Sequence, residues 1–201
     1  DVCSSDLPLT AISGTSLLTC QSNRFIDNSG NAFTVTPSGT PSVQQFQPFA
    51  RPYQYTAAVT GGSGYFDGSG DYLSVAASSQ FQYTGAYTIE AWVYPASTGG
   101  QVLVAFNSTG SSANTQYLFS VSTTATGQLF YGSGSNYSAT GPASSITANA
   151  WNHVAFVRNG TNITVYVNGV GGTATAVGTT SGISNTSMVL MVGADYTTGT
   201  T

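Results

Sequence analysis

The chain has 201 residues, of which 40% are hydrophobic and only 5% are charged, and its net charge is −4. A chain of this length can bury a substantial core, and sandwiches of this size often form one domain. With no lysine and few arginines there is no basic surface to pair with phosphates, which argues against nucleic-acid binding. No apolar run is long enough to span a membrane as a helix, and no basic amphipathic face suggests docking on one.

The first seven residues are set apart from the fold. They read DVCSSDL, do not begin with Met, and look like the translation of a common sequencing-adapter primer. We interpret residues 1–7 as an adapter-derived scar and residues 8–201 as a single domain. Cys20 is then a lone, small buried hydrophobe of a strand. If the N-terminus is genuine, Cys3 and Cys20 are instead candidates for a disulfide that closes a short loop.

The N-terminal part alternates short strand patterns with turns. Residues 17–21 predict a strand, and residues 27–31 supply turn residues between two alternating apolar runs. The strand pattern continues over residues 42–49. Residues 51–64, with Pro, Gly and Tyr, are expected to be a linker.

The central part carries the clearest pattern. Residues 65–94 contain a short apolar run, an Asp-Gly and Ser-Gly turn, a strand, a loop and a longer strand. Short alternating segments follow at 101–107, 116–121 and 128–131. Many short strands with Gly-rich turns and no helical period predict an all-β fold, an antiparallel two-sheet sandwich.

Residues 151–168 predict a hairpin. Asn159-Gly160 fits the central pair of a type I′ turn. That register sets Arg158 opposite Thr161 and His153 opposite Tyr166. The period of two then places four side chains on the core face: Val154, Phe156, Ile163 and Val165.

The other face of this hairpin carries His153. It shares that face with Trp151, Ala155, Val157 and Tyr166. We expect His153 to be packed and hydrogen-bonded rather than catalytic or metal-binding, because no acid or second His lies nearby in the sequence.

These segments resemble the laminin G-like, concanavalin A-like jelly-roll family over residues 17–195. The family phrases F-D-G-x-x-D-Y-L-x-V and F-T-I-E-A-W-V-x-P are matched within residues 66–75 and 87–95, and W-H-H-V-A-x-x-R and Y-V-N-G within 151–158 and 166–169. The resemblance implies a concanavalin A-like jelly roll. In the family, the strand matched by residues 188–194 is followed by another strand, so we expect the fold to lack its last strand and to have weakened stability.

A catalytic function is not expected. Glycoside hydrolysis needs two carboxylates, and jelly-roll glucanases of similar fold carry E-x-D-x-x-E on one strand. The single glutamate here is Glu90, whose neighbours at two-residue spacing are Thr88 and Trp92. The only imidazole, His153, has no orienting acid nearby in the sequence. No Cys-x-x-Cys pair, His-x-x-x-His spacing, P-loop or dinucleotide motif occurs.

Calcium is a candidate ligand, because similar laminin G-like and pentraxin-like domains often hold it with loop oxygens. Oxygen donors suit this ion, and the candidates are Asp67, Asp71 and Asp195. The favoured alternative is that Asp67 and Asp71 bracket a turn and accept backbone N–H bonds.

Sugar is the second candidate ligand. Glu90, Trp92 and Tyr94 lie on one face of a strand with Thr88, whereas Tyr87, Ile89, Ala91 and Val93 form the core face. An aromatic and acidic face can stack a pyranose ring and bond its hydroxyl groups. The favoured alternative is that the two aromatic side chains close a second hydrophobic layer under covering loops, with Glu90 bonded to backbone.

The function class expected is non-catalytic recognition or adhesion at an extracellular or virion surface, by one module among neighbouring modules of a larger protein. The lysine-free, Ser/Thr/Asn/Gly-rich sequence is similar to tail-fibre and structural proteins of marine phages. The alternatives are a carbohydrate-binding module of a secreted polysaccharide-degrading enzyme and a purely structural virion spacer.

Overall fold

The computed structural model describes residues 11–19, 24–44, 62–108, 115–121, 127–132, 136–177 and 188–194. The proposed scar, both cysteines and Asp195 lie outside these residues, and so does most of the expected linker. Within them the chain forms β-strands and a single 3-10 turn, η1 (Ser79–Phe81). None of the described residues forms a helix that is long and apolar enough to cross a membrane.

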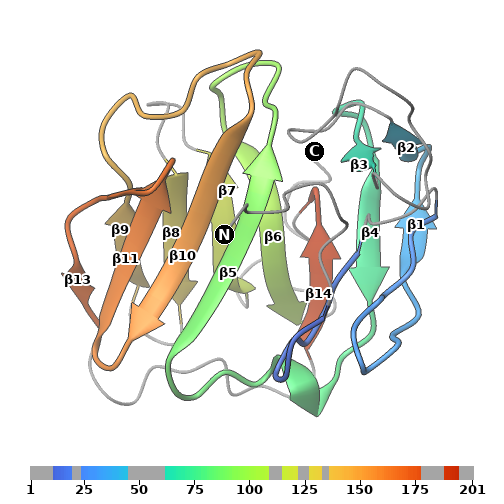
Figure 1. Cartoon of the computed structure of the whole chain (residues 1–201), viewed down its shortest axis with the longest axis horizontal. Coiled ribbons are helices and arrows are strands. Elements are labelled where there is room, and N and C mark those ends of the chain that lie inside the picture. Colours follow the sequence, from blue (N-terminus) through green and yellow to red (C-terminus); the bar gives the residue numbers. More distant parts are fainter. Residues whose placement is uncertain are drawn as a thin grey trace, which may run out of the picture.

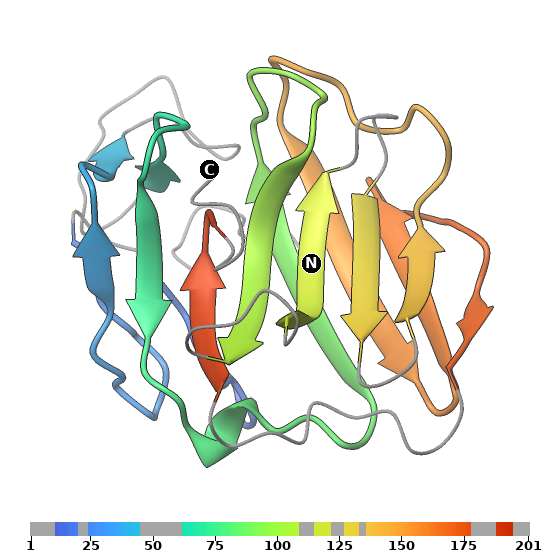
Figure 2. The same ribbon diagram turned by 180° about the vertical axis from the view of Figure 1, so that it is seen from behind.

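The larger sheet lies at the back in Figure 1 and in front in Figure 2. Its strands are all paired antiparallel in the order β1-β4-β14-β6-β7-β8-β9. In that order they span Thr36–Ser38, Tyr72–Val75, Met188–Val192, Gln101–Ser108, Thr115–Val121, Gly127–Gly132 and Asn136–Thr140. Pro37 lies in β1, an edge strand, which is where a sheet tolerates a residue without an N–H.

The smaller sheet lies over β6–β9 and is also antiparallel, in the order β12-β11-β10-β5, with β13 against β11 (Figure 1). Its strands are β12 (Val170–Gly171), β11 (Asn162–Val167), β10 (Asn152–Asn159), β5 (Tyr87–Val93) and β13 (Thr175–Ala176). A separate ribbon pairs β2 (Ser42–Gln44) with β3 (Ser63–Tyr65).

The core lies between the two sheets. The smaller sheet contributes the side chains that the hairpin pattern predicted to point inward, and β4, β6 and β14 supply the facing layer. Its buried members include Leu190, Val75, Phe106, Phe156, Ile163 and Val165. Phe81 of η1 closes one end, with its ring 6.1 Å from that of Phe106. The prediction of an all-β antiparallel sandwich is confirmed.

The N-terminal segment runs in front of β14 and β4, where the smaller sheet does not reach (dark blue in Figure 1). Leu17, Phe33 and Val35 pack from it against the core. The segment is tied together by Asp27, whose carboxylate accepts hydrogen bonds from the backbone N–H groups of Leu18 (3.0 Å), Ser29 (2.8 Å) and Phe33 (2.9 Å). The Ser29 hydroxyl adds a fourth bond at 2.8 Å.

Most predicted strands are confirmed, including those of residues 65–94, 101–107, 116–121, 128–131 and 188–194. The strand predicted at residues 17–21 is wrong for its described part, since residues 17–19 join no ladder. Leu18 instead bonds the Asp27 side chain and accepts a hydrogen bond from Asn28 N at 2.7 Å. The sequence analysis also missed β9, whose polar letters NYSAT lack an apolar alternation.

The predicted hairpin register is wrong by one residue on each strand. Asn159 pairs with Asn162 and Val154 with Val167, so the two-residue loop is Gly160-Thr161 rather than Asn159-Gly160. Gly160 has φ of +60° at the first loop position, as a type II′ turn requires. The predicted core face is nevertheless correct, because moving both partners by one residue preserves the alternation of inward and outward side chains.

Candidate functional site

The outer face of the smaller sheet carries all three predicted sugar-binding residues. Along β5 and the residue after it, even-numbered side chains are exposed and odd-numbered ones are half-buried, as the period of two predicts. Glu90, Trp92 and Tyr94 therefore share one side. The alternative that covering loops bury Trp92 and Tyr94 is wrong, because these side chains are 42% and 40% exposed.

Strand β10 brings a second row of side chains beside this one. Trp92 pairs with His153 and Glu90 with Ala155, and Ala155 pairs in turn with Tyr166 of β11. Tyr166 is positioned by β12: a Cβ on Gly171 would come within 2.9 Å of its ring, so the ring lies directly over glycine backbone. The outer face thus combines aromatic rings with one acid and one imidazole.

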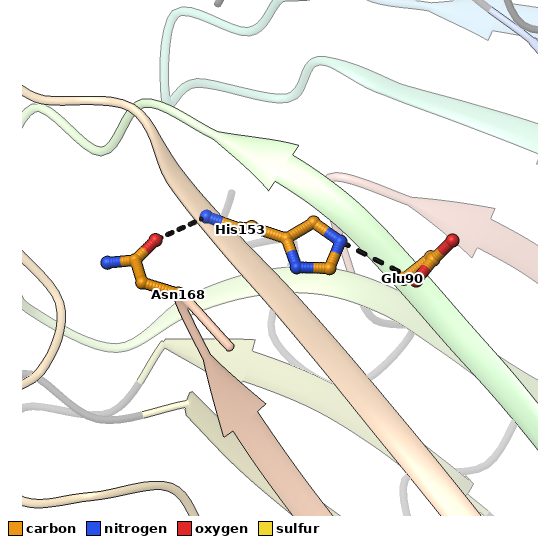
Figure 3. Close-up of polar contacts among 3 residues, drawn as sticks. All are labelled: Glu90, His153 and Asn168. Atoms are coloured by element: carbon orange, nitrogen blue, oxygen red, sulfur yellow. Dashed lines mark hydrogen bonds and ion pairs between the residues drawn. The ribbon is translucent and has the colours of Figure 1, made fainter. Parts of the chain in front are cut away.

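Glu90 and His153 meet diagonally across β5 and β10 (Figure 3). His153 Nε2 lies 3.5 Å from Glu90 Oε2, and the Glu90 side chain is 62% exposed whereas that of His153 is 28% exposed. The imidazole also packs against the Trp92 ring, with centroids 5.3 Å apart and planes tilted by 52°. The pair therefore has an anchored member, His153, and a carboxylate open to solvent.

Backbone bonds hold the His153 end of the face in place. His153 N donates to Asn168 Oδ1 at 2.9 Å, and Asn168 N donates back to His153 O at 2.8 Å. The predicted partner of His153, Tyr166, is thus replaced by Asn168, which has φ of +50° at the turn after β11. His153 is packed as predicted, but it also has an acid beside it.

A second aromatic pair extends the face past the ends of the strands. The rings of Tyr94 and Trp151 lie 5.6 Å apart in an edge-to-face arrangement. Two contacts fix this end: Asn149 N donates to Pro95 O at 2.8 Å, and the buried Asn152 amide bonds the carbonyls of Thr147 and Ala150 at 2.9 and 2.8 Å. The loop before β10 is thereby joined to the end of β5.

Two of the predicted calcium ligands, Asp67 and Asp71, accept hydrogen bonds from backbone N–H groups. Buried Asp71 accepts hydrogen bonds from Thr40 N and, at 3.2 Å, from Asp67 N. Exposed Asp67 accepts one from Ser69 N at 2.7 Å. Both carboxylates thus accept backbone N–H bonds, as the favoured alternative expects, but only the bond from Ser69 to Asp67 is a local Asx bond, whereas Asp71 also ties the turn to the distant Thr40. Among the described residues no three His, Cys, Asp or Glu side chains gather around a possible metal position. Asp195 lies outside those residues, so calcium binding stays a prediction.

The sequence analysis placed Glu90 and His153 on outward faces but did not bring them together. Their positions differ by 63 in the sequence numbering, and only the pairing of β5 with β10 makes them neighbours. The sequence did offer one hint: Glu90 and His153 lie in the two segments that match family motifs, residues 87–95 and 151–158, and each has an aromatic residue on the same outward face. The order of the strands in the sheet could not be predicted from the sequence.

A family model described as the concanavalin A-like lectin/glucanases superfamily, Laminin_G_3, matches residues 67–201. No curated protein sequence matches the chain at a significant level.

Several solved structures share the fold. The binding domain of Paraclostridial Mosquitocidal Protein 1 superposes with a TM-score of 0.63 at 13% identity, over 97% of this chain and 46% of that one. The binding domain of botulinum neurotoxin serotype G gives 0.66 at 14% identity, over 92% and 44%. This chain therefore spans about half the length of these binding domains. Domain 4 of AbnA, an extracellular GH43 arabinanase from Geobacillus stearothermophilus solved with arabinotriose, gives 0.55 at 16% identity, over 83% and 76%.

Proposed function

The chain belongs to the concanavalin A-like lectin/glucanases superfamily, and we propose that it is a non-catalytic module that binds a glycan on the outer face of its smaller sheet. The contact residues are Glu90, Trp92 and Tyr94, joined by Trp151 and His153 of the neighbouring strand and loop. The partner is a cell-surface glycan or polysaccharide.

One observation carries this proposal: large aromatic rings remain substantially exposed on a regular sheet face beside a polar pair. Trp92 and Tyr94 are 42% and 40% exposed, although Trp and Tyr side chains gain most from being buried. Sugar rings have apolar faces that stack on such rings and hydroxyl groups that bond a carboxylate or an imidazole. Glu90 and His153, 3.5 Å apart, stand beside the Trp92 ring.

A non-catalytic role is supported by the setting of Glu90. Two-carboxylate glycoside hydrolysis requires a second acid at the scissile bond, whereas the group 3.5 Å from the Glu90 carboxylate is the His153 imidazole. The chain has no other glutamate.

The test measures binding to soluble neutral polysaccharides by affinity gel electrophoresis and by fluorescence. Both tryptophans of the chain, Trp92 and Trp151, lie on the proposed face, so ligand should change the intrinsic emission. We expect Trp92→Ala to weaken binding at least tenfold, since loss of a stacking ring typically removes more than about 1.4 kcal/mol. Tyr65→Ala is the matched control, because Tyr65 is 54% exposed but belongs to the β2-β3 ribbon. Equal losses in the two variants would contradict the proposal.

We place the module in a phage virion, as part of a tail fibre, or in a cell-surface protein, and hence at an extracellular or virion surface. The Ser/Thr/Asn/Gly-rich, lysine-free sequence supports this placement. Sequencing of the surrounding locus tests it: capsid or tail genes and further modules in the same frame are expected. A signal peptide and a hydrolase domain in the same frame would refute it.

A second candidate is a carbohydrate-binding module of a secreted polysaccharide-degrading enzyme. It is supported by the similarity to domain 4 of the extracellular arabinanase, a domain of comparable length that was solved with arabinotriose. Binding to arabinan in preference to other glycans would favour it. A third possibility, a structural spacer of a virion, predicts that neither sugar nor calcium raises the melting temperature, which a bound ligand would do by mass action.

A further inference from the structure

The acidic group of the proposed face is the Glu90 carboxylate, whose neighbour is the His153 imidazole. The outward-facing partners of Thr88, Glu90 and Trp92 in the sheet are the following side chains: Val157, Ala155 and His153 on β10, and Thr164 and Tyr166 on β11. None of these is Arg or Lys. The face thus offers an open carboxylate and, within the part of the sheet that the structure describes, no permanent cation.

The outward-facing partners of these β5 residues include neither of the two arginines in the described part of the chain, Arg24 and Arg158. Arg158 is buried at 3% exposure and points to the core side of β10, where its Nε donates to Gly160 O at 3.2 Å. Arg24 belongs to the N-terminal segment that covers β14 and β4. Arg51 lies outside the described residues, and the sequence contains no lysine. A carboxylated or sulfated sugar placed on Trp92 would therefore meet the Glu90 carboxylate with no arginine beside it among the described residues.

The geometry around Trp92 suits a ring with neighbouring hydroxyl groups. Same-face residues of a strand are about 6.6 Å apart, so Glu90 and Tyr94 flank Trp92 on its two sides. His153 approaches from β10, with its ring 5.3 Å from Trp92 and its Nε2 3.5 Å from Glu90 Oε2. A sugar stacked on Trp92 would have two protein groups at one edge of its ring. The Glu90 carboxylate can accept hydrogen bonds from its hydroxyl groups, and the His153 imidazole can donate or accept them.

We propose that this face selects uncharged pyranose sugars: the ring stacks on Trp92, adjacent hydroxyl groups bond Glu90 and His153, and the Glu90 carboxylate excludes acidic sugars. This inference rests on the proposed glycan-binding function and adds the class of glycan and a specificity role for Glu90. Uncharged hydroxyl donors are the natural partners of an exposed carboxylate, whereas a second carboxylate at the same place is repelled.

The experiment uses pairs of oligosaccharides that differ only at C6. β-1,4-Linked manno-oligosaccharides are compared with mannuronate oligomers, and cello-oligosaccharides with their C6-oxidised counterparts, by tryptophan fluorescence titration at pH 7.5 in low salt. We expect a neutral member to bind and its acidic partner to bind on the order of tenfold more weakly. The difference should shrink as salt rises toward 0.5 M, where the screening length falls to a few ångströms (about 3 Å at 1 M).

Variants separate the specificity from the stacking. Glu90→Gln should reduce the difference in affinity between the neutral and the acidic oligosaccharides, because the amide keeps the size of the side chain and removes its charge. Trp92→Ala should weaken every sugar alike, and Tyr65→Ala should change nothing. Circular dichroism and thermal unfolding show whether each variant folds.

The outcomes distinguish this inference from the proposed function. If acidic partners bind as well as neutral ones and Trp92→Ala weakens both, the face binds glycans but the selection of uncharged sugars is refuted. The same holds if Glu90→Gln leaves the discrimination unchanged. If no member of a broad neutral and acidic panel binds, or binding ignores Trp92→Ala, the proposed function fails as well.

Discussion

Asp27 offers the sharpest test of what holds the N-terminal segment on the sandwich. Its carboxylate accepts three backbone N–H bonds, from Leu18, Ser29 and Phe33 at 2.8–3.0 Å, and a fourth bond from the Ser29 hydroxyl at 2.8 Å. Phe33 itself packs against the core, and Leu18 directly follows Leu17, which also does. We therefore change Asp27 to Ala, which removes every acceptor, and to Asn, which keeps the shape without the charge.

The expected loss in the free energy of unfolding follows from the hydrogen bonds that Asp27 accepts. A hydrogen bond to a charged acceptor contributes about 1.5–3 kcal/mol when it is well buried, but Asp27 is only half-buried and water screens part of the interaction. About 1 kcal/mol for each backbone N–H gives a loss of about 3 kcal/mol for Asp27→Ala. In a domain of this size that lowers the melting temperature by roughly 6–12 °C. Asp27→Asn should lose less, about 2 kcal/mol, since one amide oxygen still accepts.

The pH dependence gives an independent readout. Burial disfavours the ionised form of Asp27, but the N–H bonds from Leu18, Phe33 and Ser29 and the bond from the Ser29 hydroxyl outweigh it and hold its pKa below the usual 3.8. A carboxyl whose pKa is lower in the folded state stabilises the fold fully above its unfolded pKa. That stabilisation disappears as the pH falls through the folded-state pKa. The difference between wild type and Asp27→Asn should thus be constant from pH 7 to about 5 and shrink below about 4.

The assay is urea unfolding followed by tryptophan emission at pH 7, 5, 4 and 3. Asp67→Asn is the matched control, because Asp67 is exposed and accepts one backbone N–H, that of Ser69. We expect the control to lose no more than about 0.5 kcal/mol. The reasoning is refuted if Asp27→Asn is as stable as wild type at pH 7, or if its deficit is the same at pH 3 as at pH 7.

Three other changes probe the sandwich itself. Gly39→Ala should cost at least about 2 kcal/mol, because Gly39 has φ of +70° and its Cβ would overlap Asp71 Oδ1 and lie 2.8 Å from a backbone oxygen; a denaturant midpoint equal to wild type would contradict this. Phe106→Ala should cost about 3–5 kcal/mol in the same unfolding assay, since the ring is buried in the core, and a loss below 1 kcal/mol would show that the site collapses. Arg158→Met should raise the melting temperature measured by calorimetry, because buried Arg158 Nη1 has no hydrogen-bond partner in the described part of the chain; a marked decrease would show that the guanidinium is paired.

The fold class could be predicted because it depends on local alternation. On β5 the odd-numbered side chains face the core and the even-numbered ones face outward, as the letters YTIEAWV predict. The hairpin shows the limit of such reasoning. Asn159-Gly160 is a favourable turn by itself, but Gly160-Thr161 forms the loop. The period of two does not separate these two registers, because both keep the same side chains on the core face.

The aromatic and acidic character of the candidate face was likewise readable from β5 alone. What the sequence could not supply was the neighbour of β5. Nothing local distinguishes a sheet in which β10 lies beside β5 from one in which another strand does, and that order alone places His153 against Glu90 and Trp151 against Tyr94.

The sequence by itself determined that this chain forms antiparallel strands, which side of each strand is apolar, and which outward residues can contact a ligand. Those properties depend on the period of two along a strand and on turn residues a few positions apart. Only the tertiary structure decided the strand order, the hairpin register, the exposure of Trp92 and Tyr94, and the pairing of Glu90 with His153. Those depend on contacts between residues distant in sequence, whose free energy is set by the packing of the two sheets as a whole.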